Sequence, residues 1–256
     1  MAEPPPDAFW CRVPSRANFG DALTPWLIHR LTGRYPRFRS ADDPRHKHLV
    51  TGSVIGLAKA PGTVWGSGIM SAGDHLSDGL EILAVRGPLT RERALARNIP
   101  CPPVYGDPGL LLPRLYAPDI RATHDLGLAL HFSDSPRITA QQFPIPLKLI
   151  DMQQPVEQVV DDILCCRLVA STSLHGLIVS HAYRRPAVWL EFRPLPSGDG
   201  SKFRDYLQSI GSGQQQPLRL SPDKLNLDLL QTWAVAPPRD FDDTPLWNAC
   251  PFREAS

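Results

Sequence analysis

One segment of the chain places hydroxyl side chains, a helix start and a histidine directly after an apolar strand. It reads L-V-A-S-T-S-L-H-G-L-I-V-S-H-A-Y, from Leu168 to Tyr183. The strand should end near Ser171 and the helix should begin near Leu174, so hydroxyls and free amides would face an anion. His175 falls in the first helical turn, where an imidazole can act as acid or base. We expect an anion-binding, proton-transferring site here.

The alternative interpretation of His175 is a purely structural role, since a lone histidine is usually a core residue whose hydrogen bonds are satisfied within the protein. Its position behind Ser171-Thr172-Ser173, at a helix start, favours function. His181 lies six residues further, on another helix face, and is predicted to be structural.

Arg86 is a second candidate, because it ends an apolar strand in A-V-R-G-P-L-T. Gly87 would make the turn, and Pro88 would start the next helix at its favoured first position. A buried arginine is costly unless it is paired. Its partner is either an acidic side chain or an anionic ligand, and the residues leave both open.

Two further motifs could face a polar ligand from the first part of the chain. Asn18-Phe19-Gly20-Asp21 opens a helix, so Asn18 or Asp21 either caps that helix or contacts a ligand. Gly66-Ser67-Gly68 follows a strand, and its glycines would let backbone amides approach a ligand closely. Most such turns only reverse the chain.

The remaining candidates are charged residues at element ends. Asp107, held extended by Pro108, either caps backbone amides or contacts a ligand. Glu191 ends another strand, and Lys202 opens a helix, where a cation opposes the helix dipole. Either a bound anion or a solvated surface accounts for Lys202.

Alternation of short apolar runs with amphipathic segments predicts parallel sheets covered by helices. A polar, proline-bearing break near Pro113–His124 predicts two α/β halves with a ligand cleft between them. We expect domains at 1–118 and 119–221, with 222–256 as a helix and tail that folds back on the first half. The predicted strands are His48–Gly52, Thr63–Trp65, Glu81–Val85, Leu126–His131, Leu147–Asp151, Leu168–Ser171 and Ala187–Glu191. The predicted helices are Asp21–Leu31, Leu89–Arg97, Val156–Cys165, Leu174–Tyr183, Lys202–Ile210 and Pro222–Val235.

Composition excludes several classes of protein. A net charge of +1 over 256 residues argues against a general attraction to nucleic acid or anionic membranes. Five cysteines without a C-x-x-C pair argue against a disulfide framework and a structural zinc site. The chain has neither a signal-peptide pattern nor an apolar stretch of about 18 residues, so a cytoplasmic location is expected. P-loop, G-x-G-x-x-G, G-x-S-x-G and H-E-x-x-H motifs do not occur.

A basic run, H-R-L-T-G-R-Y-P-R-F-R, carries Arg30, Arg34, Arg37 and Arg39. It would suit a phospholipid surface or a pyrophosphate-linked carrier. The favoured interpretation of this run is a solvated helix end and loop. A peripheral contact with the inner membrane face is the alternative that stays open.

The ordered set of motifs resembles the polysaccharide pyruvyl transferase family, notably the ketal pyruvate transferases of bacterial exopolysaccharide pathways. The resemblance runs from about Asn18 to Tyr206. It implies two Rossmann-like halves arranged as in GT-B glycosyltransferases, with the active site in the interdomain cleft. It also implies phosphoenolpyruvate as donor, a hexose diol as acceptor, a cyclic and commonly 4,6-linked pyruvate ketal, and release of phosphate. The motifs that carry the resemblance are Asn18-Phe19-Gly20-Asp21, Gly66-Ser67-Gly68, Val85-Arg86-Gly87-Pro88, Gly106-Asp107-Pro108-Gly109-Leu110, Ser173-Leu174-His175-Gly176 and Ala182-Tyr183 before Pro186-Ala187-Val188.

The reaction implied by the resemblance lets us assign an expected role to each candidate residue. Phosphoenolpyruvate needs several cationic or N–H donors in a small volume, and ketal formation needs an acid near the methylene carbon and a base near the hydroxyls. His175 and Asp21 are the expected catalytic residues, and neither a metal nor another cofactor is expected. The expected donor-binding residues are Arg86, Ser173, Leu174, Gly176 and Lys202, and the expected acceptor or cleft residues are Asn18, Gly20, Ser67, Gly68, Asp107, Ser171 and Glu191.

Three interpretations stay in view. The first is the pyruvyl transferase, acting on a hexose-containing glycan or a lipid-linked oligosaccharide. The second is a glycosyltransferase on the same scaffold that uses a nucleotide sugar. The third is a non-catalytic module that binds a glycan or an anion.

Overall fold

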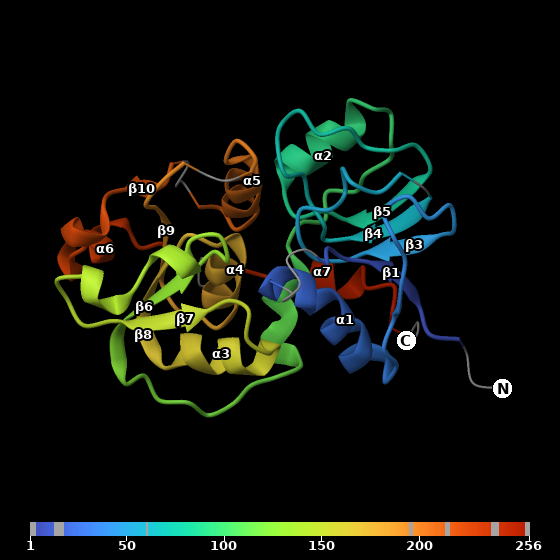
Figure 1. Ribbon diagram of the computed structural model, residues 1–256. Coiled ribbons are helices and arrows are strands. Elements are labelled where there is room, and N and C mark those ends of the chain that lie inside the picture. Colours follow the sequence, from blue (N-terminus) through green and yellow to red (C-terminus); the bar gives the residue numbers. More distant parts are fainter. Residues whose placement is uncertain are drawn as a thin grey trace.

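A computed structural model shows two lobes side by side, each built around one β-sheet (Figure 1). It describes residues 4–12, 18–59, 61–194, 197–212, 216–236 and 241–253. Both sheets are five-stranded and parallel, with strand orders β2-β1-β3-β4-β5 and β10-β9-β8-β6-β7. The predicted α/β class is confirmed, and the architecture is compatible with two Rossmann-like halves.

The first lobe is organised by short strands, of which β4 (Gly62–Trp65) is buried at all four positions. Its first helix ends at Gly33, whose positive φ of 70° lets its amide bond the His29 carbonyl at 2.8 Å, as a glycine C-cap does. The elements of this lobe are β1 (Asp7–Phe9), α1 (Phe19–Thr32), β2 (Arg37–Phe38), β3 (Lys47–Leu49), β4 (Gly62–Trp65), β5 (Leu80–Ala84), α2 (Pro88–Leu95) and the 3-10 helix η1 (Pro108–Arg114).

The second lobe has longer strands and a buried central helix, α4, that follows β8. The first eight residues of α4 are buried, because the helix lies between its own sheet and the first lobe. The elements of this lobe are β6 (His124–Leu130), η2 (Ser135–Arg137), η3 (Ala140–Gln142), β7 (Lys148–Asp151), α3 (Val156–Leu164), β8 (Cys166–Ser171), α4 (Leu174–Ala182), β9 (Ala187–Glu191), α5 (Ser201–Ser209) and β10 (Leu218–Arg219).

The C-terminal segment corrects one prediction. The expected helix Pro222–Val235 is instead a 3-10 turn, η4 (Pro222–Lys224), followed by α6 (Leu227–Trp233). Asn226 separates the two and accepts a hydrogen bond from the Leu229 amide at 2.8 Å, so a new helix begins there. A last helix, α7 (Thr244–Asn248), was not predicted.

The two C-terminal helices pack on different lobes. Leu230 of α6 joins the core of the second sheet. The carbonyl of Leu246 in α7 accepts a hydrogen bond from Trp65 of β4 at 2.9 Å. The domain limits at residues 118 and 221 stay a prediction.

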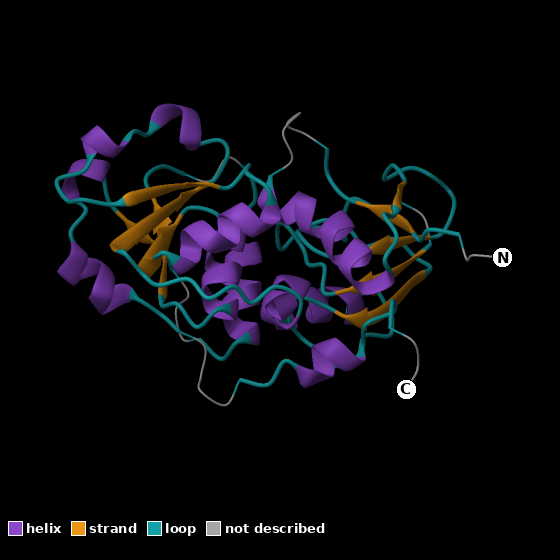
Figure 2. Ribbon diagram, turned by 90° about the horizontal axis from the view of Figure 1, so that it is seen from below, coloured by secondary structure: helices purple, strands orange, loops and turns teal. Residues whose placement is uncertain are grey.

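The lobes share a core, and Figure 2 shows several helices gathered between the two sheets. Phe19, Leu23 and Leu27 of α1 pack in one buried cluster with Leu174 and Leu177 of α4. Polar contacts also join the lobes. The amide at the start of α1 donates to the Met152 carbonyl at 2.7 Å, and Trp26 donates to Glu157 at 2.7 Å. The start of α1 is therefore held against the second lobe, at the end of β7 and the start of α3.

Candidate active site

A pocket of about 370 Å³ is lined by residues of both lobes. We call it the central pocket. The first lobe contributes Asn18 and Asp21 at the start of α1, and the second contributes the start of α4 and Lys202 of α5. The lining residues used below are Asn18, Asp21, Ser53, His131, Ser173, Leu174, His175 and Lys202.

The β8–α4 turn is fixed by Ser171, which is fully buried. Its hydroxyl lies 3.0 Å from the Ala129 carbonyl and 2.8 Å from the Ser173 carbonyl, and accepts from the Ser173 amide at 3.0 Å. A side chain at Gly176 would collide with this hydroxyl. Ser173 is the N-cap residue of α4 but makes no side-chain capping bond. The first-turn amides therefore receive no side-chain cap from Ser173.

His175 stands at this helix start with its side chain 8% exposed. Its Nε2 lies 3.4 Å from Oδ2 of the fully buried Asp107, without hydrogen-bond geometry. Asp107 accepts a hydrogen bond from the Gly109 amide at 2.9 Å, which is the capping alternative that the sequence left open beside a ligand contact. On its other side the imidazole meets Gly20, where a Cβ would lie 2.1 Å from Cε1. The ring is therefore held between Asp107 and Gly20, at the wall of the central pocket.

Asp21 supplies a carboxylate with unusual basicity. Burial raises its pKa to about 6, although His175, Asn18 and Lys202 favour the charged form. A carboxylate that titrates near neutrality can accept a proton at physiological pH. Asn18 makes no side-chain capping bond, and its Oδ1 is buried without a hydrogen-bond partner in the described structure.

Lys202 supplies a cation to the same pocket and is 7% exposed. Burial lowers the pKa of its ammonium to about 8, and the charge of Arg86 lowers it further, whereas Asp21 raises it. Most of the group is therefore protonated at pH 7. Within the residues that the structure describes, Lys202 forms no ion pair, and its Nζ lies 5.6 Å from the Phe203 ring centroid. Lys202 can bind an anion.

Arg86 has an acidic partner, Asp205 of α5, which is one of the two alternatives that the sequence left open. Both side chains are fully buried, and Nε donates to Asp205 at 3.1 Å. Its Nη1 donates to the Ser53 hydroxyl at 2.7 Å. Since Ser53 lines the central pocket, Arg86 reaches the pocket through Ser53. Its predicted contact with the donor stays a prediction.

The structure therefore divides the predicted site residues into three groups. Six line the central pocket, seven lie behind its wall or in the supporting loops, and one lines a different cavity. The lining residues are Asn18, Asp21, Ser173, Leu174, His175 and Lys202. The supporting residues are Gly20, Ser67, Gly68, Arg86, Asp107, Ser171 and Gly176, and Glu191 lines the other cavity.

The turn Gly66-Ser67-Gly68, which lies among the supporting residues, has a packing role. The Ser67 hydroxyl donates to the Gly52 carbonyl at 3.0 Å. A Cβ at Gly68 would lie 2.4 Å from the Arg86 guanidinium carbon. The turn therefore makes room for Arg86.

Sequence reasoning missed His131, which follows β6 and lines the pocket. Burial lowers its pKa to about 4, and the Lys202 charge contributes, so the imidazole is neutral at pH 7. Its Nδ1 lies 2.8 Å from the Ser133 hydroxyl. The rule that polar residues after apolar strands face the ligand would have found it, because His131 ends the apolar run L-G-L-A-L-H.

Ion pairs occupy most of the basic run, which begins in the last turn of α1 and continues beyond it. Arg30 pairs with Glu157 at 3.3 Å, and Arg37 and Arg39 pair with Asp7 at 2.8 and 2.9 Å. Within the described ranges, no helix combines the length and apolar character needed to cross a membrane. The same ranges hold no group of three His, Cys, Asp or Glu residues placed to bind a metal ion.

Comparison with known proteins identifies the family of this chain. The family model for polysaccharide pyruvyl transferase matches residues 18–192, from the start of α1 to just beyond β9. The chain is also 25% identical, over 206 residues, to "Uncharacterized protein L143" of Acanthamoeba polyphaga mimivirus, covering 77% of this chain and 71% of that protein. The matched span includes both walls of the central pocket except Lys202 and a few loop residues. The chain belongs to the polysaccharide pyruvyl transferase family, whose description supports pyruvyl transfer to a polysaccharide.

Proposed function

We propose that this chain transfers the pyruvyl group of phosphoenolpyruvate to two hydroxyls of one hexose, forming a cyclic, 4,6-linked ketal and releasing phosphate. The observation that carries the proposal is the central pocket, where Asp21 of one lobe meets His175 and Lys202 of the other. The family membership supports the pyruvyl transfer. We place the reaction in exopolysaccharide or cell-surface glycan synthesis.

The donor would occupy the side of the pocket formed by α4 and α5. Phosphoenolpyruvate carries a carboxylate and a phosphate, which favour a cation and backbone amides close together. Lys202 supplies the cation, and the helix start at Ser173 and Leu174 supplies the amides. Arg86 would support this side through Ser53.

The acceptor would lie against α1, where Asp21 and Asn18 line the pocket. One hydroxyl adds to C2 of the donor while the methylene carbon takes a proton and becomes a methyl group. Phosphate then leaves as the C2–O bond breaks, and the second hydroxyl closes the ring. The two hydroxyl protons thus balance the proton gained by the methyl carbon and the one gained by phosphate.

The residues divide this proton transfer between them. Asp21, with its pKa raised to about 6 by burial, would take a hydroxyl proton. His175, held between Gly20 and Asp107, would bind the donor or protonate its methylene carbon. Asp107 acts through His175 as a positioning residue. Because these steps move protons and one phosphate, we propose that no metal or redox cofactor takes part.

The wider setting follows from the same proposal. The two lobes would form a GT-B-like enzyme with the central pocket as its interdomain active site. The acceptor would be a hexose-containing glycan or a lipid-linked oligosaccharide, met in the cytoplasm or at the cytoplasmic membrane face.

A phosphate-release assay with mass spectrometry tests the proposal. The protein would be mixed with phosphoenolpyruvate and a panel of mannosides, galactosides and glucosides. A gain of about 70 Da on one glycoside, with phosphate released, is the expected result, because the ketal retains the carbon skeleton of the donor. His175→Gln should slow product formation by about 10²-fold or more, whereas His124→Gln, at the exposed start of β6, should not.

Thermal stabilisation by the donor distinguishes the alternatives. A ligand that binds the folded state raises the unfolding midpoint, so phosphoenolpyruvate should stabilise the protein selectively. Stabilisation by UDP or GDP in its place, without any ketal product, would favour a nucleotide-sugar transferase and contradict the proposal.

A further inference from the structure

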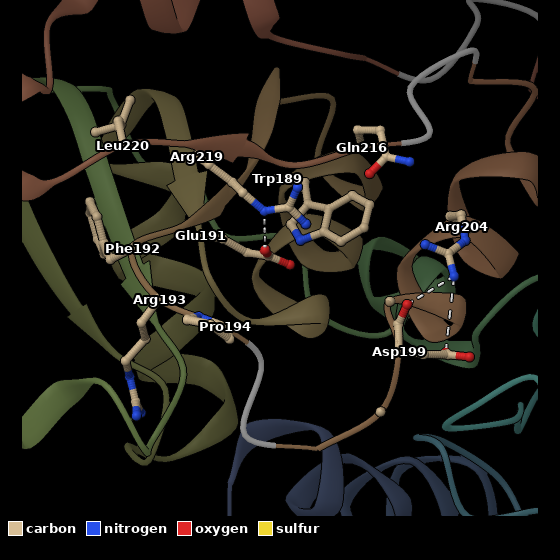
Figure 3. Close-up of a pocket in the computed structure, with 12 residues that line it drawn as sticks. Trp189, Glu191, Phe192, Arg193, Pro194, Asp199, Arg204, Gln216, Arg219 and Leu220 are labelled. Atoms are coloured by element: carbon tan, nitrogen blue, oxygen red, sulfur yellow. Dashed lines mark hydrogen bonds and ion pairs between the residues drawn. The ribbon is translucent and has the colours of Figure 1, made fainter.

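A second cavity, of about 680 Å³, adjoins the central pocket. We call it the outer pocket. It lies at the carboxyl ends of β9 and β10, beside the start of α5 (Figure 3). Its wall includes Trp189, Glu191, Asp199, Arg204 and Arg219. None of these residues lines the central pocket.

The two pockets are neighbours along one short loop. Ser197 lines the central pocket, and the next residue, Gly198, lines the outer pocket. A small cavity of about 10 Å³ shares lining residues with both pockets. It is bordered by Lys202 from the central pocket and by Glu191 and Phe192 from the outer pocket. A ligand longer than one sugar could therefore contact both pockets.

The charges of the outer pocket are balanced in pairs. Arg219 donates to Glu191 at 2.9 Å, and Arg204 lies 4.0 Å from the Asp199 carboxylate and donates to its carbonyl at 2.9 Å (Figure 3). Arg193, which also lines this pocket, donates to Asp134 at 2.6 Å, so a phosphate would meet a carboxylate beside each guanidinium. A neutral polyol instead finds donors and acceptors together, because hydroxyls can satisfy both. The wall therefore favours a sugar over an anion.

Trp189 adds an independent observation. It is 1% exposed and stacks on Phe203 with ring centroids 4.5 Å apart. Its Nε1 is buried and finds no hydrogen-bond acceptor in the described part of the chain. The indole lies between the Glu191–Arg219 pair and Arg204 (Figure 3). A buried indole N–H usually has a partner, and a sugar hydroxyl in the pocket would provide one.

We propose that the outer pocket binds the neutral sugar unit next to the hexose that receives pyruvate. The inference rests on the proposed function and makes the acceptor at least a disaccharide. Binding of this non-reacting unit would hold the reacting diol in place, and such remote binding raises the rate of the chemical step.

Acceptor kinetics form the first arm of the test. Methyl hexosides would be compared with β-linked disaccharides, including lactose and cellobiose, as acceptors. The best disaccharide should exceed its methyl hexoside in kcat/KM. Arg219→Ala, at a side chain 66% exposed, should reduce this disaccharide advantage about fivefold to tenfold and leave the methyl hexoside unchanged. Equal kcat/KM for both acceptor types would overturn the inference.

A matched control variant distinguishes a loss of sugar binding from the general effect of removing a surface ion pair. Arg167 pairs with Asp125 at 3.2 Å and is 61% exposed. It lies near the start of β8, at the opposite end of the parallel sheet from the outer pocket. Arg167→Ala should leave the disaccharide advantage intact. An equal loss of the disaccharide advantage in Arg167→Ala would show that the effect of Arg219→Ala does not come from sugar binding in the outer pocket.

A binding measurement forms the second arm and does not depend on turnover. The measurement is an NMR titration that follows the indole N–H signal of Trp189. This signal would be assigned by its absence from the spectrum of Trp189→Phe, a variant that keeps an aromatic ring against Phe203. Lactose, cellobiose and the other disaccharides should shift this signal, and inorganic pyrophosphate should not. A shift with pyrophosphate alone, or no shift with any disaccharide, would overturn the inference.

The two arms separate the two proposals. If disaccharides shift the Trp189 signal but no acceptor is pyruvylated, the proposed reaction fails while the sugar site stands. If methyl hexosides and disaccharides are pyruvylated equally well and the signal does not move, the reaction stands and the outer pocket is not a sugar site.

Discussion

The guanidinium of Arg86 lies 3.1 Å from the carboxylate of Asp205, and this fully buried pair joins the first lobe to α5. Asp205 also accepts hydrogen bonds from the amide of Thr90 at 3.0 Å and from its hydroxyl at 2.6 Å. The carboxylate therefore sits at the N-terminal turn of α2, where the helix dipole favours a negative charge. Geometry and hydrogen bonding make Asp205 a joint between the lobes.

Removing Asp205 should destabilise the protein strongly, because Arg86 would be left charged and buried. We expect Asp205→Ala to lower the free energy of unfolding by about 3–5 kcal/mol, measured by denaturant titration. Asp78→Ala removes the partner of Arg97 in an exposed pair and should cost at most about 1 kcal/mol. Similar small losses in both variants would show that the buried pair is not a joint.

Two histidines of α4 should respond in opposite ways to the same substitution. His175→Gln should lower kcat/KM by about 10²–10⁴-fold, with a small change in the melting temperature. His181 lies within hydrogen-bond distance of the Tyr206 hydroxyl, at 2.9 Å, and of the Val235 carbonyl, at 3.0 Å. His181→Gln should therefore lower stability by about 1–3 kcal/mol while the folded enzyme keeps its turnover. The reverse pattern would move the catalytic role away from His175.

The pH dependence of kcat/KM should be bell-shaped. Asp21 must lose its proton to act as base, so activity should rise as pH increases through about 6, the pKa to which burial raises it. Lys202 must keep its proton to bind the donor, so activity should fall as pH passes about 8, the pKa to which burial lowers it. Lys202→Gln should remove the high-pH limb, and Asp21→Asn should abolish most turnover. A profile flat from pH 5 to 9 would contradict both roles.

Asp21 should also reduce stability at neutral pH. Its folded-state pKa, about 6, exceeds the ordinary value of 3.8, so the folded state holds the proton more tightly and stability falls as pH rises between these values. Asp21→Asn should thus be near-neutral at pH 3.5 and stabilising above pH 6, by no more than about 3 kcal/mol. Denaturant titrations at both pH values measure the difference. If Asp21→Asn were destabilised at pH 7, burial of the charged carboxylate would not be what reduces the stability of the folded state.

Much of the architecture could be predicted from local pattern. Apolar runs such as Leu126–His131 and Ala187–Glu191 gave strands close to β6 and β9, because a buried parallel strand needs a continuous apolar segment. The missed strands β1, β2 and β10 are two or three residues long. They form through pairing with distant strands, which leaves little periodic signal. Helix α7 was missed because its stability comes from packing on Trp65.

The site was predictable where chemistry follows a strand or opens a helix, as at Asp21, His175 and Lys202. Sequence could not show which of these residues share a pocket, because that depends on the packing of α1 against the second lobe. It also could not assign Asp205 to Arg86, which lie 119 residues apart in the chain. Glu191 ends its strand as expected, but its side of the sheet opens to the outer pocket.

Gly20 offers a test of how tightly the catalytic imidazole is held. A Cβ at this position would lie 2.1 Å from Cε1 and 2.2 Å from Nδ1 of His175, so Gly20→Ala should displace the ring from Asp107 and the ligand side. Since displacement of about 1 Å can cost 10²-fold in rate, we expect at least about a tenfold loss of kcat/KM. Gly73→Ala is the matched control, because a Cβ there meets nothing within 4 Å, and its activity should be unchanged. Full activity of Gly20→Ala, with a normal melting temperature, would show that the position of the His175 ring does not limit the reaction.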